Sequence, residues 1–358
     1  MDAFTPQQST ELVSRIGTKK AHMRLDKLWF NSCMAGPLLG FGCAVLLSTE
    51  AAPWYQENAP GLIRTISAVF FPVGLTMIVL SGADLFTSNV MFMGTAFLHR
   101  RISLWDLLIN WTVSYLGNLA GMLFFVAIIT GYGGVFNVAA YRMEVINFAT
   151  QKMLLPEWHM IFLRAIGANW LVCFAVFASI SAREISSKVI AIWWPTFTFV
   201  ALGLDHVIAN MYFMPTAIWY GHPDIGVGLY IWKSMIPTAL GNIVGGGLFV
   251  GAVYWYLYLT SVGPDEIKFD LGGLDTAMEV GGPMGPSHRK SSPNSGNTSD
   301  EMQVLEGQDA EGTPNHLSSV PSSGMHMISG IGHELRADTY GKPKAGVLSD
   351  KSTPSEKV

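Results

Sequence analysis

The sequence is poor in charge. Only 13% of its 358 residues are Asp, Glu, Lys or Arg, whereas 50% are hydrophobic. A soluble domain carries about a quarter charged residues, so this composition argues against a soluble globular protein. After Gly263 lie 14 of the 26 acidic residues and 8 of the 22 basic residues. The net charge is therefore near +2 before that point and near −6 after it. The chain therefore divides into an apolar, slightly basic body and a polar, acidic tail.

Cysteine is also scarce. Cys33, Cys43 and Cys173 all lie in apolar stretches, and an odd number in such places argues against a disulfide framework. The body has no His/Cys metal spacing, no Gly-rich phosphate loop and no pair of catalytic carboxylates. The sequence thus indicates neither an enzyme nor a metal or other cofactor, and nothing in it points to a nucleic-acid partner.

A cleavable signal is missing as well. Residues 1–29 are polar and partly basic, and the first apolar run, from Phe30, is long enough to span a membrane. Residues 5–28, with Thr5 before Pro6, predict a capped helix along the membrane surface; a solvated leader is the alternative. We therefore expect residues 1–29 to form a cytoplasmic or interfacial helix.

Long apolar stretches make up the rest of the body. A bilayer needs about 20 apolar residues per helix, and six stretches meet this requirement: roughly 30–48, 62–98, 104–130, 159–181, 188–219 and 231–261. The second and fifth are too long for one straight helix, and polar motifs interrupt them at SGADLFTSN (81–89) and LGLDHVIAN (202–210). The prediction is an all-α membrane protein with six transmembrane helices over 30–262, the second and fifth broken at mid-membrane.

Basic residues gather at one set of helix ends, which the positive-inside rule assigns to the cytoplasm. This set comprises Lys19, Lys20, Arg24, Lys27, Arg100, Arg101, Arg183 and Lys188. The rule places both termini inside. After Gly263, a composition rich in Pro, Ser, Gly and charge predicts a disordered cytoplasmic tail over 263–358.

The two halves of the body resemble each other. Their interrupted spans align Gly82 with Gly203, Asp84 with Asp205 and Asn89 with Asn210, and LGNLAG (116–121) aligns with LGNIVG (240–245). Because each half has three spans, the second half enters the membrane from the face opposite to the first. This is the inverted-repeat architecture of channels and transporters. The glycines of the third and sixth spans predict close helix contacts.

Each interrupted span is expected to restart as a half-helix whose N-terminus lies near mid-membrane. Unpaired N–H groups make such an end positive, and two converging ends suit a small anion. Asp84 and Asp205 precede the restarts and are predicted to cap them, while Asn89 and Asn210 are predicted to brace the breaks.

His206 breaks the internal symmetry, because its repeat partner is Leu85. It alone of the nine histidines lies deep in a span, where ionisable side chains are rare and mostly functional. We expect it to hold or pass a proton, with a hydrogen bond to Thr87 or Ser88 on the opposing break.

FPVGLTMIVLSGADLFTSNVM (71–91) and LDHVIANMYFMP (204–215) resemble the two signatures of the formate/nitrite transporter family. GANWLVCFAVFAS (167–179) and IPTALGNIVGGGLFVGAVYW (236–255) are similar to that family's fourth and sixth spans. The resemblance covers about residues 20–262, and the chain is most similar to fungal nitrite-uptake proteins of the plasma membrane.

The resemblance implies an aquaporin-like homopentamer in the lipid bilayer, with one pore per protomer that takes up nitrite together with protons. It implies two apolar constrictions around His206: Phe71, Leu75 and Phe199 on the cytoplasmic side, with Leu85 and Phe86 near the other. By the same resemblance, Thr87 approaches His206, Asn169 lines the path and Lys152 lies in the outer vestibule. Leu204 and Asp205 depart from the Phe and Glu of many bacterial members.

Several alternatives stay open. The substrate can be formate, acetate, lactate or hydrosulfide instead of nitrite, and the ion can cross either as a neutral acid protonated through His206 or as an anion. A neutral-solute channel of the aquaporin type requires paired Asn-Pro-Ala boxes, which neither interrupted span contains. A membrane receptor or assembly protein, in which the interruptions are only packing features, is the remaining class.

Overall fold

The computed structural model describes residues 3–261, 267–270 and 274–281, and the fold is helical. In chain order the α-helices are α1 (Pro6–Ala21), α2 (Leu25–Glu50), α3 (Pro53–Asn58), α4 (Pro60–Phe70), α5 (Val73–Ser81), α6 (Phe86–Leu98), α7 (Leu104–Phe124), α8 (Ala139–Ala149), α9 (Trp158–Ser181), α10 (Ile185–Ala201), α11 (Val207–Trp219), α12 (Val227–Tyr230), α13 (Ile236–Ile243), α14 (Val253–Leu259) and α15 (Leu274–Gly281). Four π-helical segments join or extend them: η1 (Phe125–Tyr132), η2 (Thr150–Leu154), η3 (Ile231–Met235) and η4 (Val244–Ala252).

Five continuous helical stretches of the described chain are long and apolar enough to cross a membrane: Leu25–Glu50, Pro60–Ser81, Leu104–Tyr132, Trp158–Ser181 and Val227–Leu259. The helix of the second stretch ends at Ser81, and the chain restarts as the shorter α6. The predicted span over 188–219 is likewise divided between α10 and α11. The two interruptions fall at the polar motifs, where residues 82–85 and 202–206 leave the helix.

Glycine allows the long helices to approach closely. Helix α2 packs on α7, and α9 packs on α13 and η4. A Cβ atom on Gly121 would lie 1.8 Å from the backbone oxygen of Cys33, and one on Gly245 would lie 2.2 Å from that of Ile166. The backbones meet where any side chain would separate them, which confirms the predicted small-residue contacts of the third and sixth spans.

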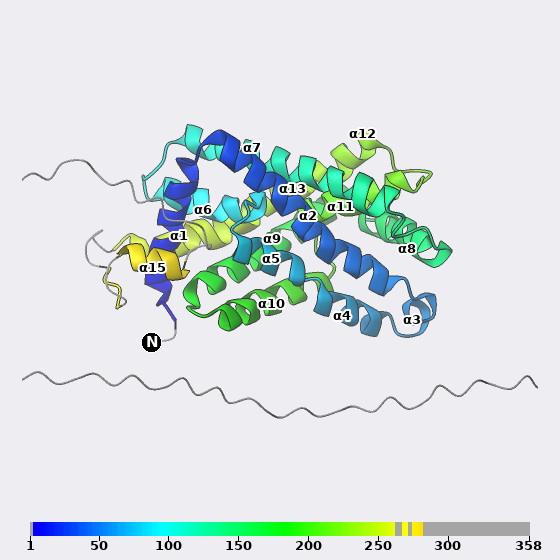
Figure 1. Ribbon diagram of the computed structural model, residues 1–358, viewed down its shortest axis with the longest axis horizontal. Helices are drawn as coiled ribbons and strands as arrows, with labels where there is room; N and C mark the ends of the chain where they lie inside the picture. The colour runs from blue at the N-terminus through cyan, green and yellow to red at the C-terminus, as the bar shows by residue number, and fades with distance from the viewer. Residues whose placement is uncertain (1–2, 262–266, 271–273, 282–358) are drawn as a thin grey trace, which may run out of the picture. The chain divides into compact units, whose positions relative to one another are not determined.

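Helix α1 is capped by Thr5 and Gln8, whose side chains exchange hydrogen bonds with each other's backbone. It is shorter than the predicted 5–28 helix, because it ends at Ala21 and α2 already begins at Leu25. Its apolar face is buried against α6 rather than laid on an open surface, and Gly17 allows this contact. Figure 1 shows α1, α6 and α15 at one end of the helical bundle and α3, α8 and α12 at the other.

Part of the predicted disordered tail is helical. Residues Leu274–Gly281 form α15, which packs on α1 and α9 and buries Ala277 completely. The prediction of disorder from 263 onward is therefore wrong for this segment, because its few apolar residues find a surface on the body. Residues 282–358 of the predicted tail lie outside the described residues.

Candidate functional site

The two interruptions share one construction. Helices α5 and α10 each end in a left-handed glycine, Gly82 with φ 73° and Gly203 with φ 68°. Such a residue closes a helix at its C-terminus, and glycine adopts this conformation at little cost. The aligned glycines of the two halves therefore stop both helices in the same way.

Two asparagines hold the restarts. Asn118 accepts a hydrogen bond from the first backbone N–H of α6 at 2.8 Å and donates to the backbone oxygen of Asp84 at 2.8 Å. Asn242 repeats the pattern in the other half, accepting from the first N–H of α11 at 2.8 Å and donating to the backbone oxygen of Asp205 at 3.1 Å. These are the asparagines of the two aligned LGN motifs, which the sequence had assigned only to helix packing.

The Asp84 carboxylate is fully buried and faces a lysine. Lys20, from α1, pairs with Oδ1 of Asp84, and Asn31 donates to Oδ2 at 2.6 Å. Asn89 adds a hydrogen bond to Oδ1 at 3.3 Å. This carboxylate does not cap α6.

Asp205 has the corresponding environment. Lys152 Nζ lies 3.2 Å from its Oδ1 and also donates to the backbone oxygens of Gly203 at 3.1 Å and Leu204 at 2.6 Å. Asn210 donates to Oδ1 at 3.4 Å. The predicted capping role of both aspartates is thus wrong: each buried carboxylate pairs with a lysine, and the amides of Asn118 and Asn242 accept from the first backbone N–H of each restart.

His206 joins the two interruptions. Its side chain is only 2% exposed, and its Nε2 lies 2.8 Å from the Thr87 hydroxyl, at the start of α6. Its Nδ1 accepts a hydrogen bond from Ala209 N–H at 3.3 Å, so the histidine also caps α11. A neutral imidazole that accepts at Nδ1 carries its proton on Nε2, and this tautomer donates to Thr87.

A cavity of about 370 Å³ leads to His206. Its ionisable lining residues come from five helical elements and the second interruption, and comprise Glu50, Arg64, Glu144, Lys152, Arg164 and His206. Lys152 is paired with Asp205, whereas neither Arg64 nor Arg164 forms a salt bridge with a described residue. The sequence suggested only Lys152 and His206 of this set, because the other charged residues come together only in the folded chain.

Two aromatic rings narrow this cavity beside His206. Phe71 and Phe199 meet edge to face with ring centroids 5.4 Å apart, and Phe199 lies 6.0 Å from the imidazole. Both line the cavity that contains Lys152, whereas Leu75 lines a separate cavity of about 30 Å³ with Lys20 and Lys188. One constriction formed by all three is therefore not observed, because Leu75 lines a different cavity from Phe71 and Phe199.

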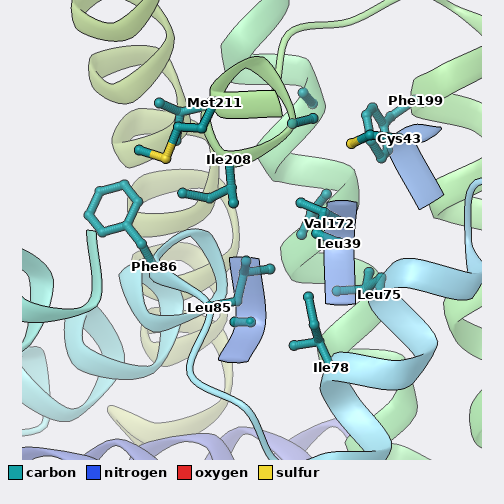
Figure 2. Packing of buried hydrophobic residues seen from close by; sticks show 14 of the residues in the cluster. Leu39, Cys43, Leu75, Ile78, Leu85, Phe86, Val172, Phe199, Ile208 and Met211 are labelled. Carbon is teal, nitrogen blue, oxygen red and sulfur yellow. The ribbon is translucent and has the colours of Figure 1, made fainter. Parts of the chain in front are cut away.

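Leu85 and Phe86, predicted near a second constriction, are buried and line neither cavity. The Phe86 ring packs edge-on against Trp111 and Tyr115 of α7, with centroids 6.4 and 5.1 Å away. Figure 2 shows the apolar side chains of this part of the core, with Phe86 directed away from Leu75. Phe86 therefore packs against α7 instead of narrowing a passage.

Asn169 is fully buried and positions Thr87. Its amide donates to the backbone oxygens of Thr87 at 3.1 Å and Asn242 at 2.7 Å, and it lines neither cavity. Its predicted place in the lining of the path is thus not observed. Ser88, next to Thr87, lines the small cavity, whereas His206 lines the large one.

The described ranges contain no group of three His, Cys, Asp or Glu side chains arranged to hold a metal ion. What the two cavities offer is lysine and arginine charge around an apolar, hydrogen-bonded junction. Such a site suits an anion that approaches in water and has to cross a region where its charge is poorly solvated.

Comparison with known proteins gives a consistent result. A family profile described as formate/nitrite transporter matches residues 7–256. The chain is 34% identical over 269 residues to a probable formate transporter of Methanothermobacter thermautotrophicus, covering 71% of this chain and 97% of that protein. It is 37% identical over 267 residues to formate-nitrite transporter 3 of Toxoplasma gondii, covering 73% of this chain and 52% of that protein.

Two solved structures share the fold. One is described as an ion channel of the FNT family, with a TM-score of 0.64 and 26% identity, covering 70% of this chain and 98% of that one. The other is a pentameric formate channel with formate bound, with a TM-score of 0.58 and 28% identity, covering 66% and 98%.

Proposed function

This chain belongs to the formate/nitrite transporter family, and from that premise we propose that it takes up nitrite across the plasma membrane together with a proton. One observation carries the proposal: a buried His206, bonded to Thr87, lines a cavity with several cationic side chains, and Ser88, next to Thr87, lines a smaller cavity with two lysines. A membrane protein that only bound a partner would have no need for ionisable groups at this depth.

The architecture that goes with this function has six membrane crossings in two inverted three-helix repeats over residues 30–262. The matched glycine turns, asparagine caps and lysine–aspartate pairs of the two halves support the repeat. Helix α6 then continues the second crossing, and α10 with α11 makes the fifth.

We infer that the protein is a homopentamer with both termini in the cytoplasm and one pore in each protomer. The likeness to a pentameric channel and the basic helix ends around Lys20, Arg101 and Lys188 support this arrangement. The Lys152 cavity then opens to the outside, and the Lys20 cavity faces the cytoplasm.

In the proposed path, an anion enters the large cavity, where Arg64, Arg164 and Lys152 stabilise it. It then meets Phe71 and Phe199, whose rings solvate a neutral acid better than an anion. Protonation of the His206 imidazole from the side of the cavity that supplies the anion gives an imidazolium beside Thr87. The imidazolium can pass a proton to the anion, which returns the ring to its neutral form and lets the neutral acid cross.

Formate is the second candidate substrate, because a formate-bound structure and several formate transporters are among the similar proteins. Acetate, lactate and hydrosulfide are weak acids or their anions and fit the same scheme. A neutral-solute channel fits less well, because the charged side chains that line the large cavity give an uncharged solute no advantage.

The direct test is uptake of labelled nitrite into liposomes that contain the purified full-length protein, with an inward proton gradient. We expect saturable uptake that formate competes with and that stops when the gradient is collapsed. Water or glycerol flux without anion uptake would favour the neutral-solute channel, and no flux of any kind would favour a receptor or assembly role.

A further inference from the structure

We propose that Glu144 and Glu50 form a proton-binding pair at the mouth of the large cavity, and that the protonation of Glu144 sets how strongly the cavity attracts an anion. The proposal rests on the anion transport proposed above. It assigns a role to two carboxylates that the path from Lys152 to His206 does not use.

Glu144 and Glu50 are joined by one hydrogen-bond network through Gln56. The Gln56 amide donates to Oε2 of Glu144 and to the backbone oxygen of Glu50, the latter at 2.6 Å. Ser67 donates its hydroxyl to Oε1 of Glu50 at 2.7 Å. Both carboxylates line the cavity, and the Glu144 residue is only 5% exposed. Two acids held together and partly desolvated favour the state in which one proton is retained.

The charged residues that share the cavity with Glu144 come from four other elements. Glu50 lies on α2, Arg64 on α4, Lys152 on η2 and Arg164 on α9. Helix α11, which also packs on α8, contributes only neutral side chains, Tyr212 among them, and on α8 itself Arg142 lies over the Tyr220 ring. Burial raises the pKa of Glu144 to about 7, and the Glu50 carboxylate adds to the rise while the Gln56 bond opposes it.

The proton changes the net charge around the cavity. With both glutamates ionised, Glu50, Glu144 and Asp205 balance the positive charges of Arg64, Arg164 and Lys152. With a proton on Glu144, one positive charge is left over. A single charge at this range changes the local concentration of an anion by about three- to ten-fold, so the cavity collects anions below neutral pH and loses this attraction above it.

The test is the pH dependence of anion uptake by the full-length protein in liposomes, with nitrite as the probe and wild type, E144Q and E57Q compared. The fraction of nitrite present as free acid falls with pH in every variant, so the informative quantity is the ratio of each variant to wild type at each pH. We expect the E144Q ratio to be near one at pH 5.5 and to rise about three- to ten-fold by pH 8. The rise should come from a lower KM with the maximal rate unchanged.

E57Q is the matched control, because Glu57 is exposed on α3 beside Gln56 and lies outside the cavity lining. Its ratio should stay near one throughout. A flat E144Q ratio, or one that changes through the maximal rate alone, would overturn the proposal. If E144Q does not fold, E50Q removes the other charge and should likewise lower the KM at pH 8. Wild type that moves no anion would instead remove the proposed function on which this inference rests.

Discussion

The Thr87 hydroxyl and the His206 imidazole, 119 residues apart in the chain, lie 2.8 Å from each other where the two interrupted helices meet. Thr87 begins one restart and His206 caps the other, so the bond joins the two halves of the body. Both partners are buried; Asn169 donates to the backbone oxygen of Thr87, and Asn242 bonds the backbone on either side of His206. A proton-bearing group is thereby fixed at the narrow point between two charged cavities.

The first prediction concerns the buried pair of Lys152 and Asp205. Replacing Lys152 by Met leaves the Asp205 carboxylate without its countercharge, and breaking a buried pair in this way costs about 3–5 kcal/mol. The double variant K152M/D205N removes both charges and should recover most of that loss in thermal unfolding of the detergent-solubilised protein.

Lys27→Met is the control for this pair. Because Lys27 is exposed, this variant should unfold at the same temperature as wild type. The pairing is contradicted if K152M/D205N is as unstable as the sum of its two single variants.

The second prediction concerns the amide caps. Asn118→Leu removes the acceptor for the first N–H of α6 and two hydrogen bonds to backbone oxygens. Each buried polar group left without a partner costs about 1–3 kcal/mol, so the variant should unfold well below wild type. Asn242→Leu should lose a similar amount of stability if the two halves are equivalent. Asn58→Leu, at an exposed helix end, should be as stable as wild type. Equal stability of all three variants would rule out the capping role.

Much of the fold and some of the site could be predicted from the residues. The apolar stretches, the polar interruptions and the approach of Thr87 to His206 depend on patterns that are local or repeated in the chain. The partners of Asp84 and Asp205 could not be predicted, because Lys20 and Lys152 come from helices whose packing is unknown until the chain is folded. For the same reason the cluster around Glu144 has no counterpart in any sequence motif.

The third prediction tests the close approach of α2 and α7. Gly121→Ala would place a Cβ atom 1.8 Å from the Cys33 backbone oxygen, which cannot yield without separating the helices. Overpacking of this kind costs about 1–3 kcal/mol. Gly61→Ala, where nothing lies within 4 Å, should leave the melting temperature unchanged or raise it slightly. Equal melting temperatures for the two variants would contradict the packing described here.

The fourth prediction follows from the Glu144 carboxyl, whose pKa is raised to about 7 by burial. A raised pKa means that the folded protein binds this proton more tightly than the unfolded chain does. The contribution of Glu144 to stability is therefore complete below about pH 4.5, its ordinary range, and is lost as the pH rises through 7. The melting temperature of wild type minus that of E144Q should fall across this window. A difference that is constant or rises with pH would show that Glu144 is ionised throughout.

The most direct measurement is nitrite uptake by wild type, His206→Asn and His206→Phe in liposomes between pH 5.5 and 7.5, with His159→Asn as the exposed control. Asparagine can still hydrogen-bond to Thr87 but cannot carry the proton, and phenylalanine removes both functions. If His206 passes the proton, both variants should lose most of their uptake and its dependence on pH, while His159→Asn keeps both. Unchanged rate and pH dependence in His206→Asn would contradict the proposed role of the histidine.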